Sequence, residues 1–183
     1  MTPLLRFKSI SCRRGGRLLF SDLDLELGAG EALQVAGPNG AGKSSLIRIA
    51  AGLLQPESGS VESASLALAD DNLALDPELP LRRALGFWGG STEDGLHALG
   101  LATLRELAVR LLSSGQRKRA TLARVVASGA PLWLLDEPLN GLDSNGAALL
   151  ASLMAEHCEA GGAILAASHA ELSGDWRRLE LTA

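Results

Sequence analysis

The chain has 183 residues, 46% of them hydrophobic and 21% charged, and its formal net charge is −4 at pH 7. This length predicts one domain, the hydrophobicity excludes a disordered chain, and the negative charge excludes a protein that coats nucleic acid, so we expect no nucleic-acid partner. No apolar run approaches the ~18 residues that cross a bilayer, and charges interrupt the N-terminal stretch where a signal peptide is apolar. Cys12 and Cys158 lie far apart in the sequence, which favours a reducing, cytoplasmic compartment.

The first 36 residues are predicted to form strands. Residues 20–27, FSDLDLEL, alternate apolar and acidic side chains with a period of two, which is typical of a half-buried antiparallel strand. Residues 28–30 form a glycine-rich turn, and residues 32–36 form a short, nearly apolar strand. Residues 44–50 then indicate a helix.

The loop between this strand and this helix has the pattern of a phosphate-binding loop. Residues 37–44 read GPNGAGKS, which fits G-x-x-x-x-G-K-[ST]. Glycines let backbone N–H groups converge on phosphates, and the start of the helix adds partial positive charge. We expect Lys43 to reach the β- and γ-phosphates and the Ser44 hydroxyl to bind Mg²⁺, which a merely structural glycine-rich turn would not require. The predicted nucleotide contacts are Gly37, Pro38, Asn39, Gly40, Ala41, Gly42, Lys43, Ser44 and Ser45.

A strand over residues 65–69 precedes a region with only helix-like spacing of leucines. This region predicts a helical subdomain over about residues 78–128, between core segments 1–77 and 129–183. Phe87 and Trp88 stand out there because aromatic residues are scarce. They serve either core packing or the docking of a partner. The basic residues of the last helix of this region are expected on a solvated face or near phosphates, and they are Arg117, Lys118, Arg119 and Arg124.

A buried strand over residues 132–135 ends in the acidic pair Asp136 and Glu137. Beside a phosphate loop, Asp136 is expected to bind Mg²⁺ and Glu137 to polarise the attacking water. A helix from about residue 144 to 159 and an apolar run leading to His169 complete the chain. Strands alternating with helices in this order predict an α/β fold with a mostly parallel sheet.

Three further motifs carry a resemblance to a known family. Residues 112–116, LSSGQ, precede an amphipathic helix from Arg117 to about Ser128, and they resemble the signature of the ATP-binding cassette (ABC) family with Ser114 in place of a glycine. Residues 140–143, NGLD, resemble its D-loop, and His169 resembles its switch histidine. The resemblance covers nearly the whole chain and implies a P-loop NTPase core with an N-terminal antiparallel β-subdomain and a small helical insert.

The resemblance implies that two copies of the domain bind ATP and Mg²⁺ between them as a homodimer. The phosphate loop of one copy then faces the signature of the other, and Asp143 communicates across the dimer. Catalysis is assigned to Glu137, His169 and Lys43, Mg²⁺ binding to Ser44 and Asp136, and further nucleotide contacts to Ser113, Gly115, Gln116 and Asp143.

Two positions depart from the family pattern. Arg14 stands where the family has an aromatic residue that stacks on the base, and a guanidinium can also stack on a base. Asn72 is the nearest substitute for the glutamine of the loop that follows the strand at residues 65–69. For each residue an ordinary surface or turn role stays open.

The small helical insert with its Phe-Trp pair is similar to that of the ATP-binding subunits of Ccm-type haem exporters, which serve cytochrome c maturation. This resemblance implies a motor bound peripherally to an integral membrane permease of that type, on the cytoplasmic face of the inner membrane. The alternatives are a subunit of another small ABC exporter and a non-transport ABC ATPase that acts on nucleic acid or the ribosome. A P-loop kinase or GTPase would leave the LSSGQ segment and His169 unexplained.

Overall fold

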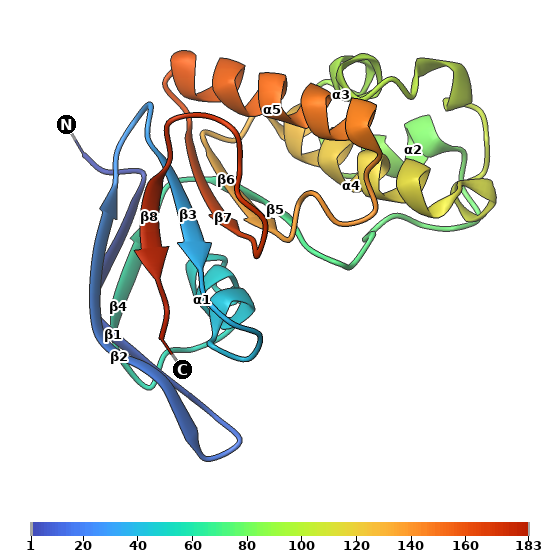
Figure 1. Ribbon diagram of the computed structural model, residues 1–183. Helices are drawn as coiled ribbons and strands as arrows, with labels where there is room; N and C mark the ends of the chain where they lie inside the picture. Colours follow the sequence, from blue (N-terminus) through green and yellow to red (C-terminus); the bar gives the residue numbers. More distant parts are fainter. Residues whose placement is uncertain (1, 183) are drawn as a thin grey trace.

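The computed structural model describes residues 2–182, which form two sheets and a group of helices (Figure 1). The antiparallel sheet has the strand order β2-β1-β4, and the parallel sheet has the order β5-β6-β7-β3-β8. The strands are β1 (Leu5–Arg14), β2 (Arg17–Leu27), β3 (Ala32–Ala36), β4 (Ser58–Ser63), β5 (Leu66–Ala69), β6 (Leu132–Asp136), β7 (Ala163–Ala167) and β8 (Arg177–Glu180). The helices are α1 (Lys43–Ala50), α2 (Leu81–Gly86), α3 (Thr92–Ala98), α4 (Ser114–Ser128) and α5 (Ser144–Glu159), with short 3₁₀ turns η1 (Ala102–Leu104) and η2 (Val109–Leu111).

The parallel sheet is covered on both faces, and each face has its own apolar cluster. One cluster joins the sheet to α1 and to the antiparallel sheet through residues such as Leu33, Val35 and Leu46. The other joins it to the helical side of the molecule through residues such as Trp133 and Ile164. This arrangement explains why β6 and β7 are buried at every position, and it confirms the predicted α/β fold.

The strand β2 departs from the simple alternation predicted for residues 20–27, because it contains a bulge. Phe20 is buried together with Leu25 and Leu27, although its position has the opposite parity. Between the pairs Ile10–Leu23 and Cys12–Phe20 the strand β2 contains one extra residue, and the backbone of Asp22 is left-handed with φ 50°. The bulge therefore turns Phe20 towards the core, where it lies against the phosphate loop.

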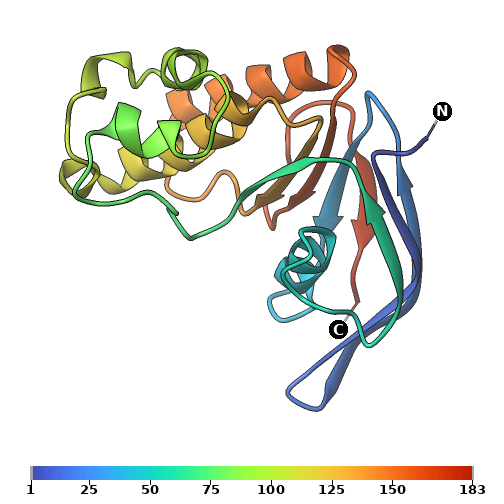
Figure 2. The ribbon, with the colours of Figure 1, turned by 180° about the vertical axis from the view of Figure 1, so that it is seen from behind.

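Between β5 and β6 all regular elements are helices or 3₁₀ turns, and they form an arm beside the parallel sheet (Figure 2). The turn that leads into α3 approaches the end of α4 closely: Gly90 has φ 73°, and a Cβ there would overlap the carbonyl oxygen of Ala127. Among the described residues, no helix is long and apolar enough to cross a membrane.

Helix α4 begins at Ser114, three residues before the start predicted from the sequence. Ser113 is its N-cap: the Ser113 Oγ accepts from the Gln116 backbone N–H at 3.3 Å, and the Gln116 Oε1 accepts from the Ser113 N–H at 2.8 Å. This reciprocal capping box satisfies two backbone donors at the helix start, which extends the helix into the LSSGQ segment.

Candidate functional site

A cavity of about 420 Å³ lies over the loop that joins β3 to α1. The cavity is lined by the polar residues of the predicted phosphate-binding loop and by one acidic residue that follows β6. Its lining residues are Arg14, Leu19, Asn39, Gly40, Gly42, Lys43, Ser44, Ser45 and Glu137.

The loop places a lysine ammonium at the start of a helix. Gly42 is the N-cap of α1 with φ 106°, and a Cβ there would lie 3.1 Å from the Cβ of Leu19, so the position suits glycine. Lys43 is only 7% exposed, and its Nζ donates to the carbonyl oxygens of Gly37 at 2.8 Å and Pro38 at 3.2 Å. A buried cation and free helix N–H groups together make this loop suitable for an anion.

Two oxygen ligands for a hard cation meet beside this loop. The Ser44 Oγ donates to the Asp136 Oδ1 at 3.1 Å, which joins the start of α1 to the end of β6. Burial raises the pKa of Asp136, the hydrogen bond from Ser44 opposes this, and the charges of Asp71 and Glu137 raise the pKa further. A carboxylate held among other acidic groups is stabilised by a divalent cation, so hydroxyl and carboxylate here fit Mg²⁺.

Glu137 and His169 form a pair at the ends of β6 and β7. The His169 Nδ1 lies 2.8 Å from the Glu137 Oε2, and the His169 backbone N–H points to the same oxygen at 3.4 Å. Glu137 follows the last residue of β6 and has a left-handed backbone with φ 46°, a conformation that is uncommon outside glycine. The pair therefore combines a carboxylate that borders the cavity with an exposed imidazole.

The residues that resemble the signature and the D-loop lie outside this cavity. Ser113, Gly115 and Gln116 form the start of α4, and Asp143 caps α5 by accepting from the Gly146 N–H at 2.7 Å. The two segments approach each other, because a Cβ on Gly115 would lie 3.2 Å from the carbonyl oxygen of Gly141. One chain thus presents the phosphate loop and the signature as separate surfaces.

Arg14 and Asn72 have different surroundings. Arg14 is exposed and lines the cavity over the β3–α1 loop together with Leu19. Asn72 is held by Asp70, which accepts from the Asn72 backbone N–H at 3.0 Å and from its Nδ2 at 3.1 Å, and it lines a different pocket. These contacts are typical of a turn residue, and a role of Asn72 in place of the loop glutamine stays untested.

Two of the four basic residues of α4 do not lie on a solvated face, while the alternative position near phosphates stays a prediction. The Lys118 Nζ and the Arg124 Nε are buried and have no hydrogen-bond partner within residues 2–182. Burial lowers the pKa of Lys118, and the negative charges of Asp71, Asp136 and Glu137 oppose the shift. Lys118 therefore brings positive charge to the acidic end of β6, which its spacing in the sequence did not indicate.

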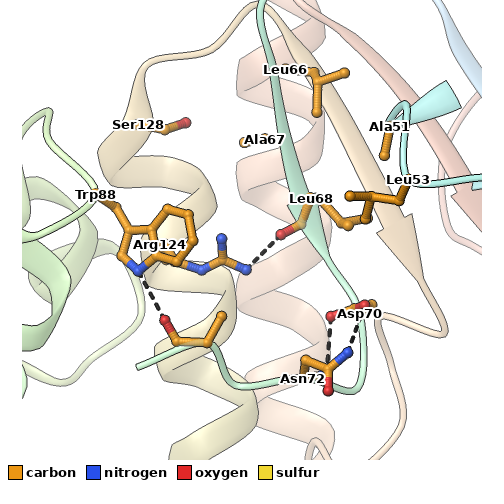
Figure 3. A pocket seen from close by; sticks show the side chains of 11 residues that line it. Ala51, Leu53, Leu66, Ala67, Leu68, Asp70, Asn72, Trp88, Arg124 and Ser128 are labelled. Atoms are coloured by element: carbon orange, nitrogen blue, oxygen red, sulfur yellow. Dashed lines mark hydrogen bonds between the residues drawn. The ribbon is translucent and has the colours of Figure 1, made fainter. Parts of the chain in front are cut away.

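A second pocket of about 420 Å³ lies where β5 of the parallel sheet meets the helical arm (Figure 3). The guanidinium of Arg124 lies in it between β5 and Trp88: its Nη2 donates to the Leu68 carbonyl at 2.7 Å, and its carbon lies 4.5 Å from the Trp88 ring centroid. The Trp88 Nε1 donates to the Ala74 carbonyl at 2.9 Å. The pocket is therefore built from fixed aromatic, aliphatic and cationic groups.

Phe87 beside this pocket is 83% exposed, so the core-packing alternative is wrong for it. Its ring packs edge-on against Trp88, with centroids 5.7 Å apart, and Trp88 itself is 45% exposed. Leu53, which lines the pocket from the side of α1, is 66% exposed. An aromatic pair and an exposed leucine around a pocket form an apolar surface of the kind that partners bind.

Comparison with known proteins agrees with this geometry. The family model described as ABC transporter matches residues 20–140. Over 181 residues the chain is 51% identical to a protein of Sphingopyxis alaskensis named cytochrome c biogenesis ATP-binding export protein CcmA, covering 94% of this chain and 93% of that protein. A protein of the same name from Novosphingobium aromaticivorans is 54% identical over 167 residues, covering 90% of this chain and 87% of the other.

Solved structures support the fold assignment. The structure of an ATP-binding subunit of an ABC transporter superposes with a TM-score of 0.82 at 25% sequence identity, covering 91% of this chain and 79% of that chain. An inward-facing putative metal-chelate type ABC transporter superposes with a TM-score of 0.80 at 24% identity, covering 92% of this chain and 74% of the other, which bears on the fold alone.

Proposed function

This chain belongs to the ABC transporter family, and on that premise we propose that it is the ATP-hydrolysing motor of a haem exporter that serves cytochrome c biogenesis. The observation that carries this proposal is the 51% identity over 94% of the chain to a relative whose name states cytochrome c biogenesis and export. The position of Glu137 and His169 beside the phosphate loop supports the hydrolytic part.

Residues in and beside the cavity have separate roles in the proposed hydrolysis. Lys43 and the N–H groups at the start of α1 bind the phosphates and offset their charge. Glu137 polarises the attacking water, and His169 holds the Glu137 carboxylate in place and contacts the γ-phosphate. Ser44 and Asp136 would hold Mg²⁺, which when bound neutralises charge on the phosphate oxygens.

We propose a homodimer as the hydrolysing unit. The separation of the phosphate loop from Ser113, Gly115 and Gln116 within one chain supports this proposal, because a second copy can bring its signature to the cavity. Asp143, which caps α5 next to Gly141, is then placed to respond to the partner copy.

The chain is proposed to work as two parts that move relative to each other. The core, about residues 1–77 and 129–183, would bind the nucleotide, and the helical part, about residues 78–128, would bind an integral membrane permease of the Ccm type. The pocket between them, with Trp88 and Arg124, is the proposed contact with the permease. The motor would then lie at the cytoplasmic face of the inner membrane, held peripherally by that contact.

Deleting the gene for this chain from its organism is expected to abolish covalent attachment of haem to c-type cytochromes. The measurement is haem staining of separated membrane proteins together with reduced-minus-oxidised spectra. The wild-type gene should restore the stain and a Glu137→Gln gene should not. Normal c-type cytochromes in the deletion strain would contradict the proposal and favour another small exporter.

Replacing Phe87 with serine is expected to weaken binding of the membrane partner about tenfold or more, because an exposed aromatic anchor at an interface contributes about 2 kcal/mol. Affinity for ATP should not change, because Phe87 lies outside the nucleotide cavity. The measurement is the amount of permease that co-purifies with the tagged chain from solubilised membranes.

The matched control for this variant is Leu18→Ser, which removes an exposed apolar side chain from the β1–β2 hairpin. Leu18 is 44% exposed and does not line the pocket beside Trp88. Equal co-purification of the Phe87 variant and the wild-type chain would contradict this docking surface.

A further inference from the structure

Gln34 is an isolated carboxamide in the middle of the parallel sheet. It is 4% exposed and lies in β3 between Leu33 and Val35, which are almost fully buried and pack on the α1 side of the sheet. Successive strand residues face opposite sides, so Gln34 faces the helical side, as does Ala166, its partner in β7. A buried polar group in such a place is unfavourable unless all its hydrogen bonds are made.

All hydrogen bonds of this carboxamide go to one short segment. The Gln34 Nε2 donates to the Ala170 carbonyl at 2.7 Å and to the Ser168 carbonyl at 3.4 Å. The Gln34 Oε1 accepts from the Leu172 N–H at 3.3 Å. The segment follows β7 directly and has no regular secondary structure of its own. The Ser168 N–H still bonds to the Val35 carbonyl at 3.2 Å, and beyond that point the Gln34 side chain supplies hydrogen bonds to the backbone of the segment.

His169 lies between the two carbonyl groups that bind Gln34. Its backbone N–H and its Nδ1 both point to the Glu137 Oε2, at 3.4 and 2.8 Å. Besides the hydrogen bond from the Ser168 N–H to the Val35 carbonyl, the segment at residues 168–172 is held by two side-chain contacts, to the sheet through Gln34 and to the Glu137 carboxylate through His169. Loss of the Gln34 side chain leaves the Ser168 and Ala170 carbonyls, on either side of His169, without these hydrogen bonds to the sheet.

We infer that Gln34 is a positioning residue for His169: its carboxamide, fixed inside β3, sets the backbone on which the imidazole reaches Glu137. This inference rests on the proposed roles of Glu137 and His169 in hydrolysis. Gln34 acts through the loop, because its side chain makes its hydrogen bonds to the backbone of residues 168–172 and does not line the nucleotide cavity. The same strand leads into the phosphate loop, so β3 positions both sides of the site.

Two substitutions in the full chain test this inference. Gln34→Met keeps an unbranched side chain of similar volume without a donor, and Gln34→Asn keeps a neutral carboxamide that is one methylene too short. Both are expected to lower kcat for ATP hydrolysis by about tenfold to a hundredfold, because small displacements of a catalytic group have effects of that order. The dissociation constant for ATP should stay within about twofold of wild type.

The control for general destabilisation is Thr121→Val. Thr121 is also buried, at 3% exposure, and its hydroxyl donates to the Arg117 carbonyl at 3.2 Å within α4. A thermal melt of each variant records the loss of stability. If Thr121→Val lowers the melting temperature as much as Gln34→Met and slows hydrolysis equally, the inference is wrong.

A double-mutant cycle with His169→Ala separates positioning from a structural defect. If Gln34 acts through His169, Gln34→Met should slow the His169→Ala chain by less than about threefold. Losses that multiply would overturn the inference, as would wild-type kcat in both Gln34 variants while His169→Ala is slow. Wild-type kcat in His169→Ala itself would instead contradict the proposed function at this residue, and the inference would fall with it.

Discussion

Replacing Glu137 with glutamine is expected to lower kcat for ATP hydrolysis by about 10²- to 10⁴-fold while ATP still binds, because an amide cannot accept the proton of the attacking water. The side chain keeps its size, and its oxygen can still accept from the His169 backbone, so the end of β6 keeps its geometry. The chain should accumulate as an ATP-bound dimer, measured by light scattering with and without ATP beside a phosphate-release assay.

Glu171→Gln is the matched control, because Glu171 is an exposed carboxylate two residues after His169 that does not line the cavity over the β3–α1 loop. It should hydrolyse ATP at the wild-type rate. Unchanged turnover in Glu137→Gln would contradict the assignment of Glu137 as the base. Slow turnover in both variants would show that the loss of negative charge near the site is the cause, and not the loss of a proton acceptor.

Replacing Lys43 with alanine is expected to weaken ATP binding by about 10²- to 4 × 10³-fold. Removing one member of a buried charge pair costs about 3–5 kcal/mol, and each 1.4 kcal/mol corresponds to a factor of ten. Lys43 is 7% exposed, so water screens little of its attraction to phosphate. Binding is measured by titration calorimetry.

Arg48→Ala tests whether the loss of any positive charge on α1 has the same effect. Arg48 is exposed on the same helix and does not line the cavity. Its removal should change the dissociation constant for ATP by less than about threefold, as expected for a solvated charge. An equal loss in both variants would indicate a general electrostatic effect, and retained affinity in Lys43→Ala would contradict the phosphate-loop assignment.

The sequence predicted those features whose chemistry lies within a few consecutive residues. The phosphate loop at residues 37–44 and the acidic pair Asp136 and Glu137 each carry their own strand and turn signals, so both position and type could be predicted. Helix α5 is a similar case, because Asp143 caps its start and its predicted limits agree with the structure. The assigned roles of the site residues stay predictions.

Features that depend on distant segments could not be predicted in this way. Gln34 is the one polar residue of an otherwise apolar strand, and this pattern indicates a buried hydrogen-bonding side chain. Its partners could not be predicted, because they lie more than 130 residues away in the chain. The burial of Lys118 depends on how α4 packs beside acidic residues from other segments. The exposure of Phe87 could not follow from residue type, since an aromatic side chain suits both a core and an interface.

The exposed ring of Phe87 has a practical consequence for handling the protein. Phe87, Trp88 and Leu53 leave an apolar area open to water around the pocket between sheet and arm. A surface of this kind promotes self-association when no partner covers it. We therefore expect the chain, purified alone at high concentration, to self-associate through this face, which lies apart from the phosphate loop.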